Sequence, residues 1–179
     1  MRILLVFSLL TWMVGPNSLA LAQAGAAQVV ANATELSNAK PIDVKTVSNA
    51  LKARKHLILF DVRTREEYRV SHLPSAQHLV PEIDVETVVR RVGRGGVGAI
   101  VVFYCTIGGR SAVIAEATAE FLSAKGVVDV RVLENGIIGW ANAGLPLIDR
   151  RGPTQFVHPF DAVMAKHLAH PEMARFESR

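Results

Sequence analysis

The chain has 179 residues, of which 50% are hydrophobic and 20% are charged, a composition typical of globular proteins that excludes a chain disordered throughout. The formal net charge is +4, and the basic residues are scattered along the chain, so we expect no nucleic-acid partner. The length is sufficient for one ordinary domain with extensions.

The first residues follow the pattern of a secretory signal peptide. Met1 and Arg2 give a short positive start, residues 3–14 form an apolar run, and small residues around Ala22 and Ala24 offer cleavage sites. The apolar run is shorter than the roughly 20 residues of a membrane span, so we expect no stable membrane span. We expect residues 1–24 to be a cleaved signal peptide and the mature protein to be periplasmic or secreted. An uncleaved anchoring helix remains the alternative.

The segment before the domain and the first elements of the domain differ in pattern. Residues 25–40 are rich in alanine and polar residues without a strong period, which favours a flexible lead. Residues 43–53 carry apolar residues at helical spacing, with Asp43 as the expected N-cap. Residues 57–60 form an unbroken apolar run, which predicts a strand buried on both faces.

Short elements are expected next. Thr64 and Glu67 have the spacing of a capping box that opens a short helix. Residues 76–80 lie between two prolines and predict a short strand or extended segment. Helical signals return over residues 82–92 and stop in a glycine-rich stretch.

A second buried strand is predicted over residues 99–104, and Cys105 follows it directly. From Ser111 the pattern is helical through Ala124, with Gly126 as the expected C-cap.

The last elements complete an alternation of strands and helices. Residues 128–133 predict another buried strand and residues 136–143 a short helix. This order indicates an α/β domain with a mostly parallel central sheet flanked by helices on both faces. We expect the domain over residues 41–150, and a C-terminal tail over residues 151–179 with one helix over residues 160–168.

Cys105 is the single cysteine of the chain. An exported protein resides in an oxidising compartment, where cysteines usually form disulfides. The presence of a cysteine with no partner in its own chain therefore needs an explanation. Three readings are open: the thiol is buried and inert, it pairs between chains, or it reacts.

The segment after Cys105 favours a reactive thiol. In open parallel sheets, reactive groups collect beyond the carboxyl ends of the strands. Gly108 and Gly109 allow a tight turn with backbone N–H groups pointing inward, which makes a nest for an anion. The following helix and Arg110 add positive potential, so we expect the thiolate form to be favoured.

Four segments, in order along the chain, resemble the signatures of the rhodanese sulfurtransferases, and the resemblance covers nearly all of residues 41–150. The segments are Asp61-Val62-Arg63 with Glu66-Glu67-Tyr68, His72-Leu73-Pro74-Ser75-Ala76, residues 105–110 with cysteine first, glycine fourth and arginine sixth, and Asn135-Gly136-Ile137-Ile138-Gly139-Trp140 with Ala143-Gly144-Leu145-Pro146. Ser71, Ser75 and Asn135 stand where the family commonly has glycine.

The resemblance implies a rhodanese-like single domain that transfers sulfane sulfur through a persulfide on Cys105, without a cofactor or a metal. The residues whose backbone would hold the terminal sulfur are Thr106, Ile107, Gly108, Gly109 and Arg110. Loop-supporting roles fall to Asp61, Arg63 and Ser111; the alternative for Asp61 and Arg63 is a helix cap and a surface arginine.

The implied substrates are a small sulfur donor and a thiol or cyanide acceptor, with a protein as a further candidate acceptor. Arg110 is the one cation in the loop, whereas thiosulfate enzymes of the family often carry another. Efficient thiosulfate turnover is therefore in question, and a persulfide donor stays open.

Two other functions remain to be weighed. Four residues separate Cys105 from Arg110, whereas tyrosine-phosphatase-type loops resemble Cys-x5-Arg, which disfavours phosphatase or arsenate chemistry. A non-catalytic persulfide carrier, a redox-sensing module or a partner-binding module fits the same residues, since exposed low-pKa thiols also oxidise readily.

The histidines carry no strong pattern for chemistry. We expect His72 and His78 to be structural or surface residues. His167 and His170 are three residues apart and could share a helical face, but no cysteine or carboxylate at matching spacing completes a metal site.

Overall fold

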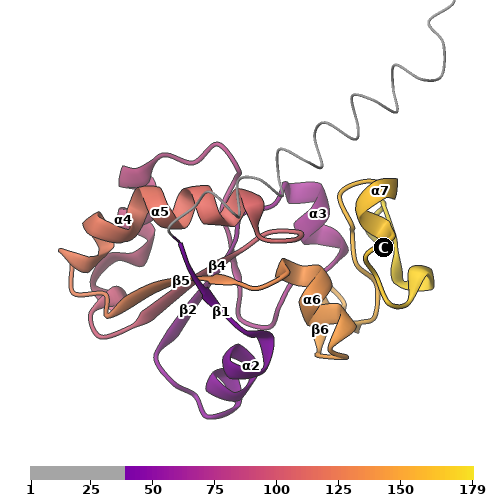
Figure 1. The fold of residues 1–179 in the computed structure, drawn as a ribbon, viewed down its shortest axis with the longest axis horizontal. Coiled ribbons are helices and arrows are strands. Elements are labelled where there is room, and N and C mark those ends of the chain that lie inside the picture. Colours follow the sequence, from indigo (N-terminus) through magenta and orange to yellow (C-terminus); the bar gives the residue numbers. More distant parts are fainter. Residues whose placement is uncertain (1–38) are drawn as a thin grey trace, which may run out of the picture.

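The computed structural model describes residues 39–179 (Figure 1). The expected signal peptide over residues 1–24 lies outside the described residues, as does the lead apart from its last two residues. Within residues 39–179, no helix is both long enough and apolar enough to span a bilayer.

The centre of the fold is a five-stranded parallel sheet with strand order β1-β5-β4-β2-β3. Its strands are β1 (Lys40–Ile42), β2 (Leu57–Asp61), β3 (Gln77–His78), β4 (Ile100–Tyr104) and β5 (Asp129–Leu133). Four of them were predicted. The sequence pattern missed β1, because it is a three-residue edge strand that contains Pro41, and proline is tolerated only at such edges.

Four helices connect these strands, and a fifth follows β5 directly. They are α2 (Val44–Lys52), α3 (Arg65–Val70), α4 (Val85–Val92), α5 (Gly109–Ser123) and α6 (Gly136–Asn142), with a 3-10 turn η1 (Gly93–Gly96) after α4. Two expected N-terminal caps are confirmed. Asp43 accepts a hydrogen bond from the backbone N–H of Thr46 at 2.9 Å, and Thr64 and Glu67 form both bonds of a capping box.

Three expected helix ends were wrong by a few residues. α4 begins at Val85 and not at residue 82, because Asp84 caps it through the N–H of Thr87. α5 begins at Gly109, two residues earlier than expected. Its C-cap is Ala124, while Gly126 lies beyond it in a turn at φ +89°.

Helices cover both faces of the sheet, as predicted (Figure 1). Successive strand residues point to opposite faces, so each strand contributes to two cores. One core joins the sheet to α4 and α5 and includes Phe60, Val101, Phe103, Val88 and Leu122. The other joins the sheet to α2 and α6 and includes Leu59, Val102, Leu133, Val47 and Trp140.

The chain after α6, called here the C-terminal extension (residues 144–179), packs beside α3 and α6 (Figure 1). It contains the antiparallel pair β6 (Leu147–Asp149) and β7 (Gly152–Thr154), the helix α7 (Ala162–Ala165) and the 3-10 turn η2 (Pro171–Met173). The helix expected over residues 160–168 is shorter, because Asp161 accepts bonds from the N–H groups of Val163 and Met164 and caps it there. Four buried residues of the extension belong to the core beside Trp140, namely Leu147, Val157, Met164 and Leu168.

Candidate active site

Cys105 lies at the carboxyl end of β4, in the loop that leads into the 15-residue helix α5. Its side chain is fully buried. The backbone N–H of Gly108 donates a hydrogen bond to the sulfur at 3.2 Å, and the hydroxyl of Ser111 lies 3.7 Å from it. The sulfur therefore lies at a helix N-terminus, where free N–H groups and the helix dipole favour negative charge.

The loop is shaped by contacts on its outer side. The N–H groups of Ile137 and Ile138 in α6 donate to the carbonyls of Cys105 and Thr106 at 2.9 and 3.2 Å. Because a trans peptide directs its N–H opposite to its carbonyl, the N–H groups of residues 106 and 107 point away from α6. The hydroxyl of Ser111 donates to the carbonyl of Gly108 at 2.8 Å. These bonds hold the loop in one shape.

Gly136, the first residue of α6, makes this contact possible. It has φ +52°, and a Cβ at this position would lie 2.6 Å from the carbonyl oxygen of Thr106, closer than real side chains come. Any larger residue would push α6 away from the loop.

Arg110 does not point to the sulfur as a free cation. It donates to both carboxylate oxygens of Glu67, from Nη1 to Oε2 at 2.9 Å and from Nη2 to Oε1 at 2.8 Å. Nη2 also donates to the hydroxyl of Thr106 at 2.7 Å, and this hydroxyl donates to Glu67 at 3.0 Å. The expected cation beside the thiol is thus largely neutralised by a carboxylate.

Glu67 is 2% exposed, and its charge depends on Arg110. Burial alone would raise the pKa of the carboxyl, but the hydrogen bonds and charge of Arg110 outweigh burial and lower the pKa to about 2. The sequence indicated Glu67 as part of a capping box and of the first family signature, but assigned it no contact with the loop. One feature of the sequence could have indicated that Glu67 also binds the loop arginine. A single cation in a buried loop requires an anion nearby.

Asp61 and Arg63 form a second ion pair, and both side chains are fully buried. Arg63 Nε and Nη2 donate to the carboxylate at 2.9 and 2.7 Å, and Nη2 also donates to the carbonyl of Ser71 at 2.6 Å. Burial alone would lower the pKa of Arg63, but the charge and hydrogen bonds of Asp61 raise it. The alternative of a surface arginine is wrong, and the cap of α3 is Thr64 and not Asp61.

This second ion pair adjoins the candidate loop. Asp61 pairs in register with Tyr104, the residue before Cys105, and the positive charge of Arg63 helps to lower the pKa of Glu67. Arg63 also reaches the C-terminal extension, because its Nη1 donates to the carbonyl of His158 at 3.5 Å. Of the predicted site residues, Asp61 and Arg63 therefore lie behind the loop, while residues 105–111 form it.

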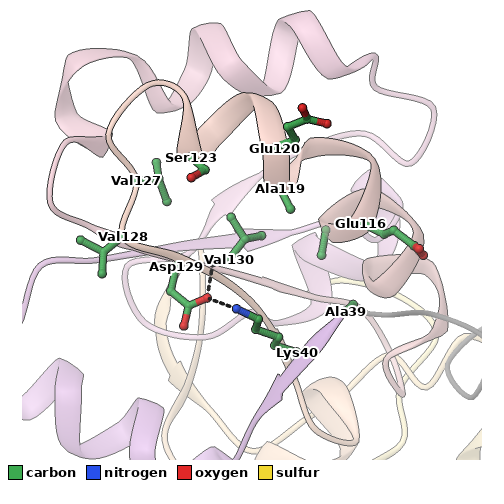
Figure 2. Close-up of a pocket in the computed structure, with 11 residues that line it drawn as sticks. Ala39, Lys40, Glu116, Ala119, Glu120, Ser123, Val127, Val128, Asp129 and Val130 are labelled. Carbon is green, nitrogen blue, oxygen red and sulfur yellow. Dashed lines mark hydrogen bonds and ion pairs between the residues drawn. The ribbon is translucent and has the colours of Figure 1, made fainter.

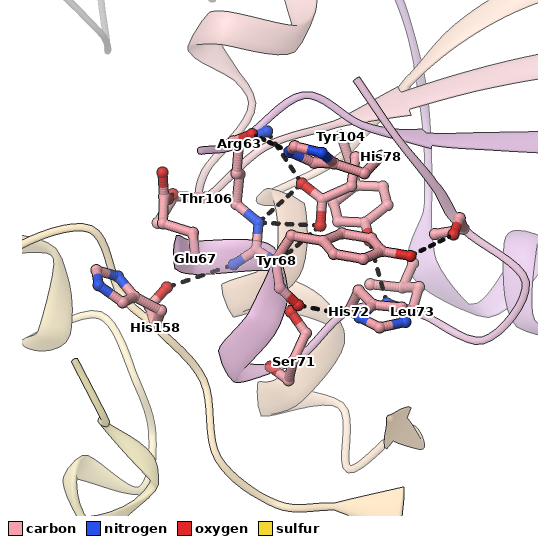
Figure 3. A network of polar contacts seen from close by, with 12 residues as sticks. Arg63, Glu67, Tyr68, Ser71, His72, Leu73, His78, Tyr104, Thr106 and His158 are labelled. Atoms are coloured by element: carbon pink, nitrogen blue, oxygen red, sulfur yellow. Dashed lines mark hydrogen bonds and ion pairs between the residues drawn. The ribbon is translucent and has the colours of Figure 1, made fainter. Parts of the chain in front are cut away.

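The histidines that the sequence singled out have contacts of their own. The ring of Tyr68 stacks on His72 at 3.8 Å between centroids and contacts His78 at 4.9 Å (Figure 3). His170 lies 3.3 Å from Glu172. Among residues 39–179, no group of three histidine, cysteine or acidic side chains could hold a metal ion.

A groove of about 360 Å³ lies between α5 and the strands β1 and β5 (Figure 2). Its wall includes Lys40 and Asp129, whose charged atoms are 3.7 Å apart. None of residues 105–111 lines it. The groove is therefore separate from the candidate active site.

Known proteins are similar to this chain in sequence and in fold. The profile of the rhodanese-like domain family matches residues 43–143. A sulfurtransferase of Allochromatium vinosum is 32% identical over 115 residues, which cover 62% of this chain and 96% of the relative.

Solved structures are similar at the level of the fold. A thiosulfate sulfurtransferase from Pseudomonas aeruginosa has a TM-score of 0.52 and 25% identity; the match covers 74% of this chain and 24% of that longer chain. A rhodanese-like domain from Anabaena has a TM-score of 0.50 and 18% identity, over 61% of this chain and 78% of that one.

Proposed function

Because the chain belongs to the rhodanese-like domain family, we propose that it is a sulfurtransferase in which Cys105 carries sulfane sulfur as a persulfide. The observation that carries this proposal is the hydrogen bond from the N–H of Gly108 to the sulfur of Cys105, at the N-terminus of α5. Backbone N–H groups directed at this position can stabilise the terminal sulfur of a persulfide, which is an anion.

The proposed reaction has two steps. The thiolate of Cys105 attacks the outer sulfur of the donor; a new S–S bond forms, the old bond to that sulfur breaks, and the leaving group takes the electron pair. A thiol or cyanide acceptor then attacks the terminal sulfur and releases the thiolate of Cys105. The reaction needs no oxidant or reductant besides the donor and the acceptor. Because the two steps are separate, ping-pong kinetics are predicted.

The residues proposed for these steps are those of the loop. The backbone N–H groups of residues 106–110 hold the terminal sulfur, while Ser111, Asp61 and Arg63 keep the loop in place. The proposed donor is a persulfide or thiosulfate, and the acceptor is a small thiol, cyanide or the thiol of a partner protein.

Mass spectrometry of the intact protein tests the proposal. Incubation with a low-molecular-weight persulfide or thiosulfate should add about 32 Da, one sulfur atom, and cyanide or a thiol should remove it, as covalent transfer requires. Cys105→Ser should show neither change. If several donors fail to add sulfur to the fully reduced protein, the function proposed is wrong.

A non-catalytic persulfide carrier is the second candidate, and the full burial of Cys105 favours it, because a covered sulfur exchanges slowly with solutes. The two candidates differ in steady-state turnover with cyanide. A catalyst releases thiocyanate over many cycles, whereas a carrier releases one equivalent and then needs slow reloading.

We also propose that the protein acts outside the cytoplasm, on the basis of the signal-peptide pattern of residues 1–24. N-terminal sequencing of the native protein should then find a start between about residues 23 and 25. A native chain that begins at Met1 would rule out cleavage.

A further inference from the structure

Cys105 is buried, and only a small part of its loop, called here the entrance, is open to solvent. Of residues 105–111, only Ile107 and Arg110 are partly exposed, and the other five are buried. A sulfur donor that approaches from the open side of the loop meets these two side chains first. Whatever borders Ile107 and Arg110 controls which donors can enter.

One side chain of the C-terminal extension borders this entrance. The ring of Phe160 lies over the guanidinium of Arg110, with its centroid 5.0 Å from the guanidinium carbon. Phe160 is 46% exposed, so part of its apolar surface is available to a ligand. Phe160 lies outside the segment that matches the family profile, which ends at residue 143.

The conformation of the turn that carries Phe160 holds the ring over Arg110. Phe160 has φ +78°, a conformation that costs energy for any residue with a bulky side chain. Its N–H donates to Nδ1 of His158 at 3.1 Å, and the carbonyl of His158 accepts a bond from Arg63. Pro159 between them is buried. Figure 3 shows His158 beside the polar network of Arg63 and Glu67. The backbone strain is therefore maintained by contacts with the candidate site.

The charge at this entrance disfavours a dianion. Both terminal nitrogens of Arg110 are bonded to Glu67, so the one cation of the loop is offset by a carboxylate that is 2% exposed. A doubly charged donor such as thiosulfate loses hydration at the entrance and meets no unpaired charge in Arg110. A donor with an apolar group can instead bury this group against Phe160 and Ile107.

We propose that Phe160 is a specificity-determining residue that makes the site select sulfane-sulfur donors carrying an apolar organic group over thiosulfate. The inference rests on the proposed function, because it requires that Cys105 accepts sulfur. It goes beyond this function in naming the class of donor and the residue that recognises it.

Thiosulfonates test the proposal, because they vary the organic group and leave the reacting atoms unchanged. The thiolate of Cys105 attacks the outer sulfur of R–SO₂–S⁻, the S–S bond of the persulfide forms, and R–SO₂⁻ leaves with the electron pair. Benzenethiosulfonate and methanethiosulfonate have the same charge and differ in the organic group, which is phenyl in the first and methyl in the second, while thiosulfate has no organic group. The rate of mass gain on the intact protein is measured with each donor.

The wild-type protein should accept sulfur from benzenethiosulfonate about tenfold faster than from methanethiosulfonate, as expected when one face of a ring is buried. Phe160→Gly should reduce this ratio to about twofold or less. Glycine adopts a positive φ without strain, so this variant should stay folded. Phe160→Tyr keeps the ring and should keep the preference.

Phe121→Ala is the matched control. Phe121 is an exposed phenylalanine on α5, 11 positions after Arg110, which corresponds to about 16 Å along the helix. Its removal should leave the donor ratio unchanged. If Phe160→Gly takes up sulfur with the wild-type ratio, Phe160 does not select the donor, and the role of Cys105 still stands. If no donor adds sulfur to the wild-type protein, the proposed function fails, and donor selection fails with it.

Discussion

Arg110 and Glu67, 43 positions apart in the sequence, are joined by two parallel hydrogen bonds of 2.9 and 2.8 Å. Glu67 also completes the N-terminal cap of α3, where its side chain accepts from the N–H of Thr64 at 3.0 Å. One carboxylate therefore links a helix cap to the loop that carries Cys105, so a change at either end should affect both stability and the loop.

Removing Arg110 should lower the free energy of unfolding more than removing a surface arginine would. Arg110→Ala leaves the charge of Glu67 buried without its ion-pair partner, and we expect a loss of about 3 kcal/mol, the lower end for a broken buried pair because Arg110 keeps some exposure. The double variant Arg110→Ala with Glu67→Gln should regain part of the loss, since no unpaired charge is left. Urea unfolding of both single variants and the double variant gives the coupling energy. Additive losses would mean that the two side chains act independently.

The same pair predicts how stability depends on pH. The pKa of Glu67 is about 2 in the folded protein, below its ordinary value near 4.5. A carboxyl with a lowered pKa contributes stability that is fully present above the unfolded pKa and is lost as the pH falls through the folded pKa. The unfolding free energy should therefore fall between about pH 4.5 and pH 2. Glu67→Gln should be less stable at pH 7 and show a shallower decline in this window. An equal decline in both proteins would assign the acid sensitivity to other carboxyls.

Two glycines with positive φ provide a matched test of how α6 holds the loop. Gly136→Ala places a Cβ against the carbonyls of Cys105 and Thr106, whereas a Cβ on Gly144, at φ +66°, meets nothing within 4 Å. Both variants bear the cost of a left-handed alanine, roughly 1 kcal/mol. Gly136→Ala should in addition slow sulfur loading of Cys105 by about tenfold or more, because a small displacement at a reacting group has a large effect on rate. Thermal unfolding and the mass assay together separate the two effects. Equal loading rates would show that α6 does not position the loop.

The regular parts of this fold were predictable because each has a local signal. Residues 57–60 and 99–104 are continuous apolar runs, and both form buried strands. Thr64 and Glu67 are close in sequence, and they form the capping box that their spacing indicates. The loop after Cys105 has two glycines, and the positive φ of Gly108 shows why one of them is needed.

The less predictable features depend on contacts between distant segments. Nothing near Glu67 indicates that its carboxylate binds Arg110, because the pairing exists only after β2 and β4 align in the sheet. The carbonyl of His158 binds Arg63 across 95 positions, and the residues around it have no strong period. The sequence therefore predicted the loop with its thiol, but not the neutralised charge of Arg110 or the aromatic ring that covers it.

Because Val157, Met164 and Leu168 are buried, the end of the folded domain differs from the end of the segment that matches the family. The homology unit ends at residue 143, but the folding unit extends at least to residue 168, because these three side chains share one core with Trp140. Each buried side chain of this size contributes about 1.5–3 kcal/mol, so the three together are comparable with the whole stability of a small domain. A fragment cut at the homology boundary would expose the apolar face of α6 to water and invite aggregation. The C-terminal end of a recombinant fragment should therefore be chosen from the extent of the buried core and not from the residues that match the family.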